Sequence, residues 1–296
     1  MKILVFILLT LPYGARCKLI LLDDQACQKM WNEAENNLIF PGELSVEAGN
    51  NPMFKVVKGA GAQGNEKLRS EEFTQFRALL VDYQTPNKIN QQNIDNFITA
   101  VTQPCGPVDA AFNYLKTEPN ALPFPMKTLE EFRTTLKSLW FSAADSHGFK
   151  HVFVGEQFQH KHPSEIRYRG FHNWYQYYIE EERKGVKILS LPTFVKDKRP
   201  NFIKDLKFNW EGKKKQVSTG SPMFVGTSPS FELALFTTCL LKGRGEAGGN
   251  PPVGPYRETD CKCKIYVPGI GKSTVEVRTV ENKDGKVVTA APMNVY

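Results

Sequence analysis

The histidines of this chain lie close together in the sequence. All of them fall between residues 147 and 172, and they are His147, His151, His160, His162 and His172. An imidazole ring has an unperturbed pKa near physiological pH, so two facing rings can act as a general base and a general acid. The segments around His151 and His172 are therefore the first candidates for an active site.

His151 and His172 have different local sequences. His151 opens a β-branched and aromatic run that ends at Val154, and this pattern predicts a strand. His172 follows Gly170-Phe171 and precedes a helical pattern. Taken singly, a histidine at a strand end is more often a packed or surface residue, and His172 could simply begin an amphipathic helix.

The first half of the chain has helical periodicity. Apolar residues recur at i, i+3 and i+4 through residues 68–83 and 94–101. Thr128 and Glu131 have the spacing of a capping box, and an apolar stripe follows them. Residues 48–64, rich in glycine and asparagine, predict a loop.

After Gly148 the pattern changes to strands. Strand-like runs occupy residues 151–154, 186–191, 223–225, 264–267 and 274–280, and residues 283–285 predict a hairpin turn. We expect helices over residues 173–184, with Gly185 as C-cap, and from Ser228-Pro229, and a long loop from Gly243 to Gly254. The predicted class is α+β, with a helical part over residues 18–140 and a mostly antiparallel, β-rich catalytic part over residues 141–296.

The N-terminus predicts export. Residues 1–17 combine one lysine, an apolar run of about ten residues and a small-residue end, which is typical of a secretory signal peptide. No later stretch is apolar enough to span a membrane. We therefore expect a secreted protein.

The cysteine spacing argues against a zinc site, and the net charge favours an anionic partner. Beyond Cys17 an odd number of cysteines remains, so at least one thiol is free or pairs between chains, and Cys261-Lys-Cys263 is too tight for the usual zinc spacing. The net charge of +7 favours an anionic partner such as nucleic acid, glycosaminoglycan or anionic lipid.

Blocks of sequence around these histidines resemble a known family. Gly-Phe-Lys-His-Val-Phe-Val-Gly-Glu at 148–156, Gly-Phe-His-Asn-Trp at 170–174 and Gly-Thr-Ser-Pro-Ser-Phe-Glu-Leu-Ala-Leu at 226–235 look like signature blocks of the EndoU (poly(U)-specific endoribonuclease) family. The similarity spans most of the chain beyond residue 17. It implies the EndoU-like fold and an endoribonuclease that cuts single-stranded RNA near uridines, leaving 2′,3′-cyclic phosphate and 5′-hydroxyl ends. We also expect a monomer.

The resemblance also implies the site residues. The catalytic histidines match His151 and His172, and the lysine after Trp-x-Gly matches Lys215, with Lys213 and Lys214 as neighbours that could be confused with it. Attack by a ribose 2′-OH on phosphorus needs a base, an acid and a cation near the non-bridging oxygens. We predict His172 as base, His151 as acid and Lys215 as electrostatic stabiliser.

Further residues are assigned by the same resemblance. Ser221, Thr289 and Trp174 are expected to bind substrate, with core packing as the alternative for Trp174. Glu156 is a supporting residue and a candidate ligand for Mn²⁺ or Ca²⁺, an ion that the chemical step itself does not require.

The chain also departs from the family pattern. Lys150 stands where most relatives have a glutamate, and Ala291 stands where they have a tyrosine that contacts the uridine. These changes put the metal requirement and the base preference in question. Residues 157–168 are longer and more basic than usual, and with Arg167 and Arg169 they could extend a phosphate-binding track.

Two other functions are compatible with the sequence. Lys150 and Ala291 motivate an RNA-binding protein on the same fold with weak or no cleavage. The spacing of His160 and His162, with His172 as a third ligand, motivates a metallohydrolase.

Overall fold

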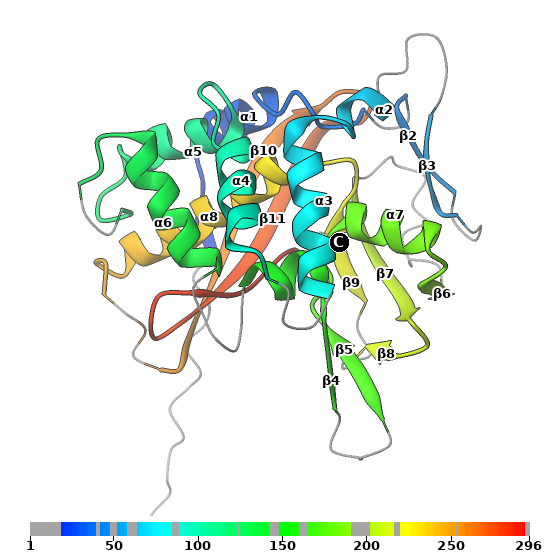
Figure 1. Ribbon diagram of the computed structural model, residues 1–296. Helices are drawn as coiled ribbons and strands as arrows, with labels where there is room; N and C mark the ends of the chain where they lie inside the picture. The colour runs from blue at the N-terminus through cyan, green and yellow to red at the C-terminus, as the bar shows by residue number, and fades with distance from the viewer. Residues whose placement is uncertain are drawn as a thin grey trace, which may run out of the picture.

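The computed structural model describes residues 19–39, 42–47, 52–57, 64–84, 89–122, 125–141, 148–159, 165–190, 202–215, 220–250, 252 and 254–293. The predicted signal peptide and His147, His160 and His162 lie outside these residues. Within them the chain combines helices with mostly antiparallel sheets (Figure 1). No helix in the described part of the chain has the length and apolar character needed to cross a membrane.

Helices dominate the first half. They are α1 (Asp24–Asn32), α2 (Gly64–Lys67), α3 (Glu71–Gln84), α4 (Gln91–Val101), α5 (Pro107–Leu115) and α6 (Leu129–Phe141), followed later by the π-helix η1 (Lys150–Val154), α7 (Trp174–Glu182) and α8 (Pro229–Glu246). The longer helices bury apolar residues at helical spacing, as Phe73, Phe76 and Leu80 do in α3.

The strands belong mostly to the second half. They are β1 (Leu19–Leu21), β2 (Leu44–Val46), β3 (Phe54–Val56), β4 (Glu156–Gln159), β5 (Ile166–Arg169), β6 (Val186–Ser190), β7 (Ile203–Trp210), β8 (Lys214–Lys215), β9 (Ser221–Phe224), β10 (Tyr256–Val267), β11 (Gly271–Asn282) and β12 (Val287–Pro292). The described sheets have the orders β1-β10-β11-β12, β2-β3, β4-β5-β8 and β6-β7-β9. Only β1–β10 and β5–β8 are parallel pairs among these. The predicted α+β class is confirmed.

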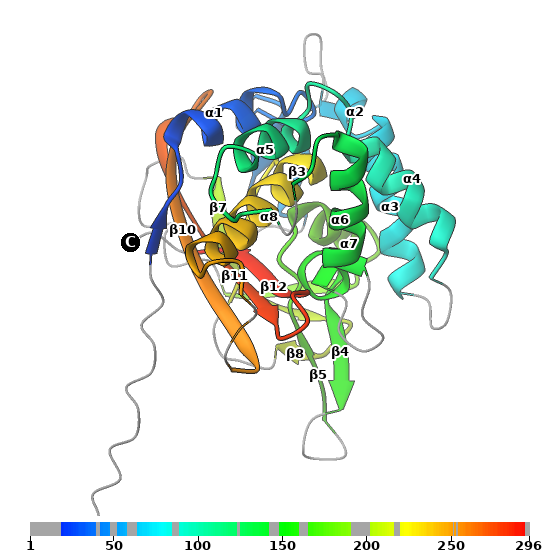
Figure 2. The same cartoon turned by 90° about the vertical axis from the view of Figure 1, so that its left-hand side faces the viewer.

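Helix α8 lies at the centre of the core. It packs against β10 and β11 on one side and against α5 on the other, as Figures 1 and 2 show. Leu233, Phe236 and Leu240 are among its many buried side chains, and a helix that is apolar on all sides belongs in an interior. Its N-cap is Ser228, whose Oγ accepts from the Phe231 amide at 3.3 Å, as predicted.

Two local predictions, a helix capping box and a hairpin turn, are also confirmed. The Glu131 amide donates to Thr128 Oγ1 at 3.2 Å, and the Thr128 amide donates to Glu131 Oε2 at 3.1 Å, which completes the capping box. Between β11 and β12, Gly285 takes a φ of 69° in the predicted hairpin turn.

The prediction of a strand at residues 151–154 is wrong, because this segment belongs to η1. Val152, Phe153 and Val154 are all buried, although a strand with one solvent face would expose alternate residues. A short apolar run is compatible with a buried helix as well as with a strand, and here the packing against α3 decides for the helix.

Two helix boundaries that were predicted from glycines differ in the structure. Helix α7 has its C-cap at Arg183, and Lys184 rather than Gly185 takes the left-handed φ of 58°. A Cβ on Gly185 would lie 2.3 Å from Glu180 Oε2, so the glycine serves close packing. The predicted loop from Gly243 is also partly wrong, because α8 continues to Glu246 and Gly243 lies against Thr259.

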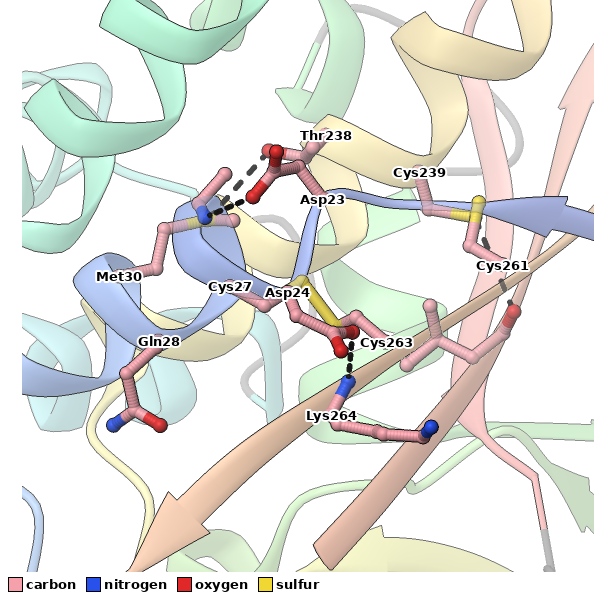
Figure 3. Close-up of a disulfide and its surroundings, with 12 residues drawn as sticks. Asp23, Asp24, Cys27, Gln28, Met30, Thr238, Cys239, Cys261, Cys263 and Lys264 are labelled. Carbon is pink, nitrogen blue, oxygen red and sulfur yellow. Dashed lines mark hydrogen bonds between the residues drawn. A yellow bond between two sulfur atoms is a disulfide. The ribbon is translucent and has the colours of Figure 1, made fainter.

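Two disulfides attach helices to one strand of the large sheet (Figure 3). Cys27 of α1 bonds to Cys263 of β10, and Cys239 of α8 bonds to Cys261 of the same strand. Cys105 is free and exposed, in agreement with the odd cysteine count. β10 is thereby linked covalently to both helices that cover it.

The Cys27–Cys263 disulfide is expected to contribute strongly to stability, because it closes a loop with a sequence separation of 236 residues. Replacing both cysteines with serine should lower the free energy of unfolding by about 2–5 kcal/mol, measured by urea denaturation. Cys105→Ser is the matched control and should leave the midpoint unchanged. An unchanged midpoint in the double variant would mean that this bond contributes nothing to the folded state.

Candidate active site

The backbone holds the two histidine segments side by side. The Phe171 amide donates to the His151 carbonyl at 2.9 Å, and the His172 amide donates to the Val152 carbonyl at 2.7 Å. The centroids of the His151 and His172 rings are 6.2 Å apart, with 39° between the ring planes. The two predicted catalytic histidines therefore meet in space.

Gly170 makes this close approach possible. Its φ is 69°, and a Cβ at this position would lie 1.9 Å from the His151 carbonyl oxygen. Phe171 also has a positive φ, 64°, which is strained for a phenylalanine. Its ring packs against Phe208 and Trp210, each with a centroid distance of 5.0 Å, and this packing holds the strained turn.

The His172 ring is buried and fixed in orientation. Its Nδ1 lies 3.0 Å from the Pro222 carbonyl oxygen, which can only accept. The neutral ring must therefore carry its proton on Nδ1, and this leaves a lone pair on Nε2. Burial, with the nearby charges of Lys215 and His151, lowers the pKa of His172 well below its usual 6.5. His172 is thus neutral at physiological pH.

The His151 ring lies in a different electrostatic environment. Its Nδ1 is 3.7 Å from Glu156 Oε1, and Arg169 donates to Glu156 Oε2 at 2.8 Å. Burial raises the pKa of Glu156, but hydrogen bonds and charge from His151 and Arg169 outweigh it, so the net pKa lies below the usual value. The anionic Glu156 attracts the ring whenever the ring carries a second proton.

The structure distinguishes Lys215 from its two neighbours. The Lys215 Nζ donates to the Gly170 carbonyl at 3.2 Å, to the Gly220 carbonyl at 3.1 Å and to Ser221 Oγ. Lys213 instead donates to Glu211, and Lys214 is exposed. Burial lowers the pKa of Lys215 to about 7, although the charge of Asp205 opposes this. Lys215 is therefore the lysine that joins the histidines, and the Gly170 carbonyl links it to their segment.

The predicted substrate-binding residues have different outcomes. Ser221 is fully buried next to Lys215, and its Oγ is 3.4 Å from the Gly170 carbonyl. Thr289 is half-buried in β12, which packs beside both η1 and β9. Trp174 does not fit the substrate-binding role, because its ring is fully buried and its Nε1 donates to the Thr227 carbonyl at 2.7 Å. Core packing, the alternative interpretation of Trp174, agrees with this position.

Two functional residues have roles that the sequence did not indicate. Arg169 was expected on a phosphate track, but its guanidinium is paired with Glu156. Gly170 is part of a sequence motif, and the structure shows that a Cβ there would collide with the His151 carbonyl oxygen and that its own carbonyl accepts from Lys215. A glycine directly before a catalytic segment was the available signal for such a close approach.

The residues around Glu156 do not fit a divalent-ion site. The Glu156 oxygens face Arg169 and His151, and the residue directly before His151 is Lys150, a cation where a second carboxylate would be needed. No group of three or more histidine, cysteine or acidic side chains in the described residues could hold a metal. The predicted role of Glu156 as a metal ligand therefore finds no support in this arrangement.

Comparisons with known proteins identify the family of this chain. The family model for "Endoribonuclease XendoU" matches residues 24–278. "Poly(U)-specific endoribonuclease-A" from Xenopus laevis is 33% identical over 211 residues, 64% of this chain and 65% of that protein, so the match spans just under two thirds of this relative's length. "Uridylate-specific endoribonuclease" from Homo sapiens is 35% identical over 135 residues, covering 41% of this chain and 30% of that protein.

A solved structure shares the fold. The structure described as "XendoU: a splicing independent snoRNA processing endoribonuclease" aligns with a TM-score of 0.65 and 24% identity, over 92% of this chain and 97% of that one. The family model covers most of the sequence and includes both histidine segments and Lys215. The chain therefore belongs to the XendoU endoribonuclease family.

Proposed function

We propose that this protein is an endoribonuclease that cuts single-stranded RNA at uridines and leaves 2′,3′-cyclic phosphate and 5′-hydroxyl ends. Family membership supports the activity and the substrate class. The observation that carries the mechanism is the meeting of a neutral buried His172, a carboxylate-paired His151 and Lys215 around Gly170. Two titratable rings in opposed environments are typical of an acid–base pair.

His172 is the general base in this mechanism. The Nε2 lone pair takes the proton of the ribose 2′-OH as the O2′–P bond forms. Because Nδ1 is held by the Pro222 carbonyl, the ring presents Nε2 without a change of tautomer. Its lowered pKa keeps the ring unprotonated before the reaction.

His151 is the general acid. It gives a proton to O5′ as the P–O5′ bond breaks, and Glu156, anchored by Arg169, orients the ring. Lys215 stabilises the negative charge that develops on the non-bridging phosphate oxygens. These groups complete the transesterification, and no step is assigned to Mn²⁺ or Ca²⁺.

Uridine preference is part of the proposal. Ser221 lies beside Lys215, where it would contact the base next to the scissile phosphate. Thr289 lies on the neighbouring β12. Ala291 stands where the family pattern has a tyrosine, so the aromatic ring that would contact the uridine is missing here. We therefore expect a weaker uridine preference than an aromatic residue would give.

Secretion is also part of the proposal. Residues 1–17 have the pattern of a signal peptide, and the two disulfides fit an oxidising compartment. We further expect a monomer in solution.

The pH dependence should follow Lys215 and His172. Above pH about 7, kcat/KM should fall by up to about tenfold per pH unit, because Lys215 loses its proton and its charge. On the acid side, the rate should persist below the ordinary histidine pKa, because the pKa of His172 is lowered. Lys215→Arg, which stays charged, should remove the contribution of Lys215 to the alkaline fall and leave that of the general acid His151. The same alkaline fall in this variant would assign it to another group.

The proposed function is tested with the mature protein and a short RNA that contains one uridine. The product ends are identified by mass spectrometry in EDTA, Mn²⁺ and Ca²⁺. Cleavage at the uridine with a 2′,3′-cyclic phosphate end supports the proposal in whichever ionic condition it occurs. Salt-sensitive binding without cleavage in every condition would support the RNA-binding alternative that Lys150 and Ala291 motivate.

A further inference from the structure

A buried carboxyl group contacts Asn173, the residue that directly follows His172. Glu232, in the first turn of α8, is fully buried. Its oxygens accept from Asn173 Nδ2 at 3.3 and 3.2 Å, and its Oε1 is 2.6 Å from Thr227 Oγ1. These contacts are all neutral. Burial raises the pKa of Glu232 to about 8, so the group is mostly a neutral acid at pH 7.

The Asn173 amide is engaged at both ends. Its Oδ1 accepts from the Gln176 amide at 3.0 Å as the N-cap of α7, and its Nδ2 points to Glu232. The backbone of Asn173 also pairs with Phe224 of β9. Asn173 directly follows His172, so the side-chain bond to Glu232 fixes one end of the turn that carries the ring.

The start of α8 holds this turn at a second point. The Thr227 carbonyl accepts from Trp174 Nε1 at 2.7 Å, while the Thr227 hydroxyl contacts Glu232. One short segment, from Thr227 just before α8 to Glu232 in its first turn, thus contacts two consecutive residues after His172. Because α8 is packed into the core, it provides a rigid reference for the catalytic segment.

We propose that Glu232 is a positioning residue, which acts through Asn173 to hold His172 in register with His151 and Lys215. This inference rests on the proposed ribonuclease function of the same site. A buried carboxyl group without a cation costs free energy compared with an apolar side chain. A carboxyl group at this position accepts a hydrogen bond from Asn173, which an apolar side chain cannot do.

Glu72 provides a matched control. It is also buried and also contacts the start of α8, where its Oε2 accepts from the Ser230 amide at 3.2 Å. Its Oε1 accepts from Asn36 Nδ2 at 2.7 Å, a residue far in sequence from the catalytic turn. Glu232→Met and Glu72→Met therefore each remove a buried carboxyl group at the start of α8. Only Glu232→Met removes the bond to Asn173.

The experiment compares these variants with Glu232→Gln, whose amide can donate to Thr227 and accept from Asn173 as the neutral acid does. We expect Glu232→Met to lower kcat by about 10- to 100-fold with little change in KM, because His172 is displaced. Glu232→Gln should retain kcat within about threefold, and Glu72→Met should change kcat no more than its loss of folded protein explains. If Glu232→Met does not fold, Glu232→Asp takes its place, since the shorter side chain cannot reach Asn173.

A second readout does not depend on RNA cleavage. The NMR titration of the His172 ring should shift in Glu232→Met and remain near that of the unaltered protein in Glu232→Gln and Glu72→Met. An unshifted titration in Glu232→Met, or an equal kcat loss in Glu72→Met and Glu232→Met, would overturn the positioning role. If the unaltered protein cuts no RNA, the proposed function fails, while the titration still decides whether Glu232 positions His172.

Discussion

His172→Ala is expected to lower the rate constant of RNA cleavage by about 10²–10⁴-fold, because it removes the ring whose Nδ1 is held by Pro222 and whose Nε2 is left unprotonated. Single-turnover kinetics with the one-uridine RNA measures this loss. The fold should survive, since α7 keeps its N-cap Asn173 and the turn keeps its backbone bonds. Circular dichroism and the unfolding midpoint check that point.

The leaving group separates the roles of the two histidines. In an RNA whose bridging O5′ is replaced by sulfur, the leaving thiolate needs little protonation, so loss of the acid matters less. We expect this substrate to restore much of the rate of His151→Ala and little of the rate of His172→Ala. The reverse pattern would exchange the two roles and would contradict the assignment of His172 as base.

Gly170→Ala is expected to reduce kcat/KM by about 100-fold and to destabilise the protein, although it adds only one methyl group. That group would lie 1.9 Å from the His151 carbonyl oxygen, so η1 and the His172 turn must move apart. The Gly170 carbonyl, an acceptor of the Lys215 ammonium, would move with them. Steady-state kinetics and thermal unfolding measure the two effects.

Gly212→Ala separates backbone strain from this collision. Gly212 also has a positive φ, 76°, but nothing lies within 4 Å of the position that its Cβ would take. A non-glycine residue in the left-handed region costs roughly 1–2 kcal/mol at either site. Gly212→Ala should therefore lose some stability and keep its kcat/KM. Equal losses of activity in the two variants would show that strain alone, and not the contact with His151, is responsible.

The sequence predicts the site better than it predicts the local structure around it. Residue types and motif order select His151, His172 and Lys215, and the structure brings these three together. The backbone at His151 is a π-helix and not a strand, because a buried apolar run has no periodicity that separates the two. Trp174 shows the same difficulty, since an aromatic residue near an active site suits either stacking or the core.

Contacts between distant segments account for what the sequence could not provide. Arg169 pairs with Glu156 only because β4 and β5 form a hairpin, and Glu232 reaches Asn173 across 59 positions. Cysteine spacing likewise permits several pairings. None of these choices leaves a local pattern, because each depends on how complete elements pack.

The Cys27–Cys263 bond also determines how the protein would respond to a protease. A single cut anywhere between these two residues would separate the chain into pieces that the bond still joins. The α1 and β10 ends would stay together, and so would the core around α8. A nicked molecule would therefore run as one band without reductant and as two bands with it. In the secreted form that we propose, this linkage would allow the assembled active site to outlast the intact chain.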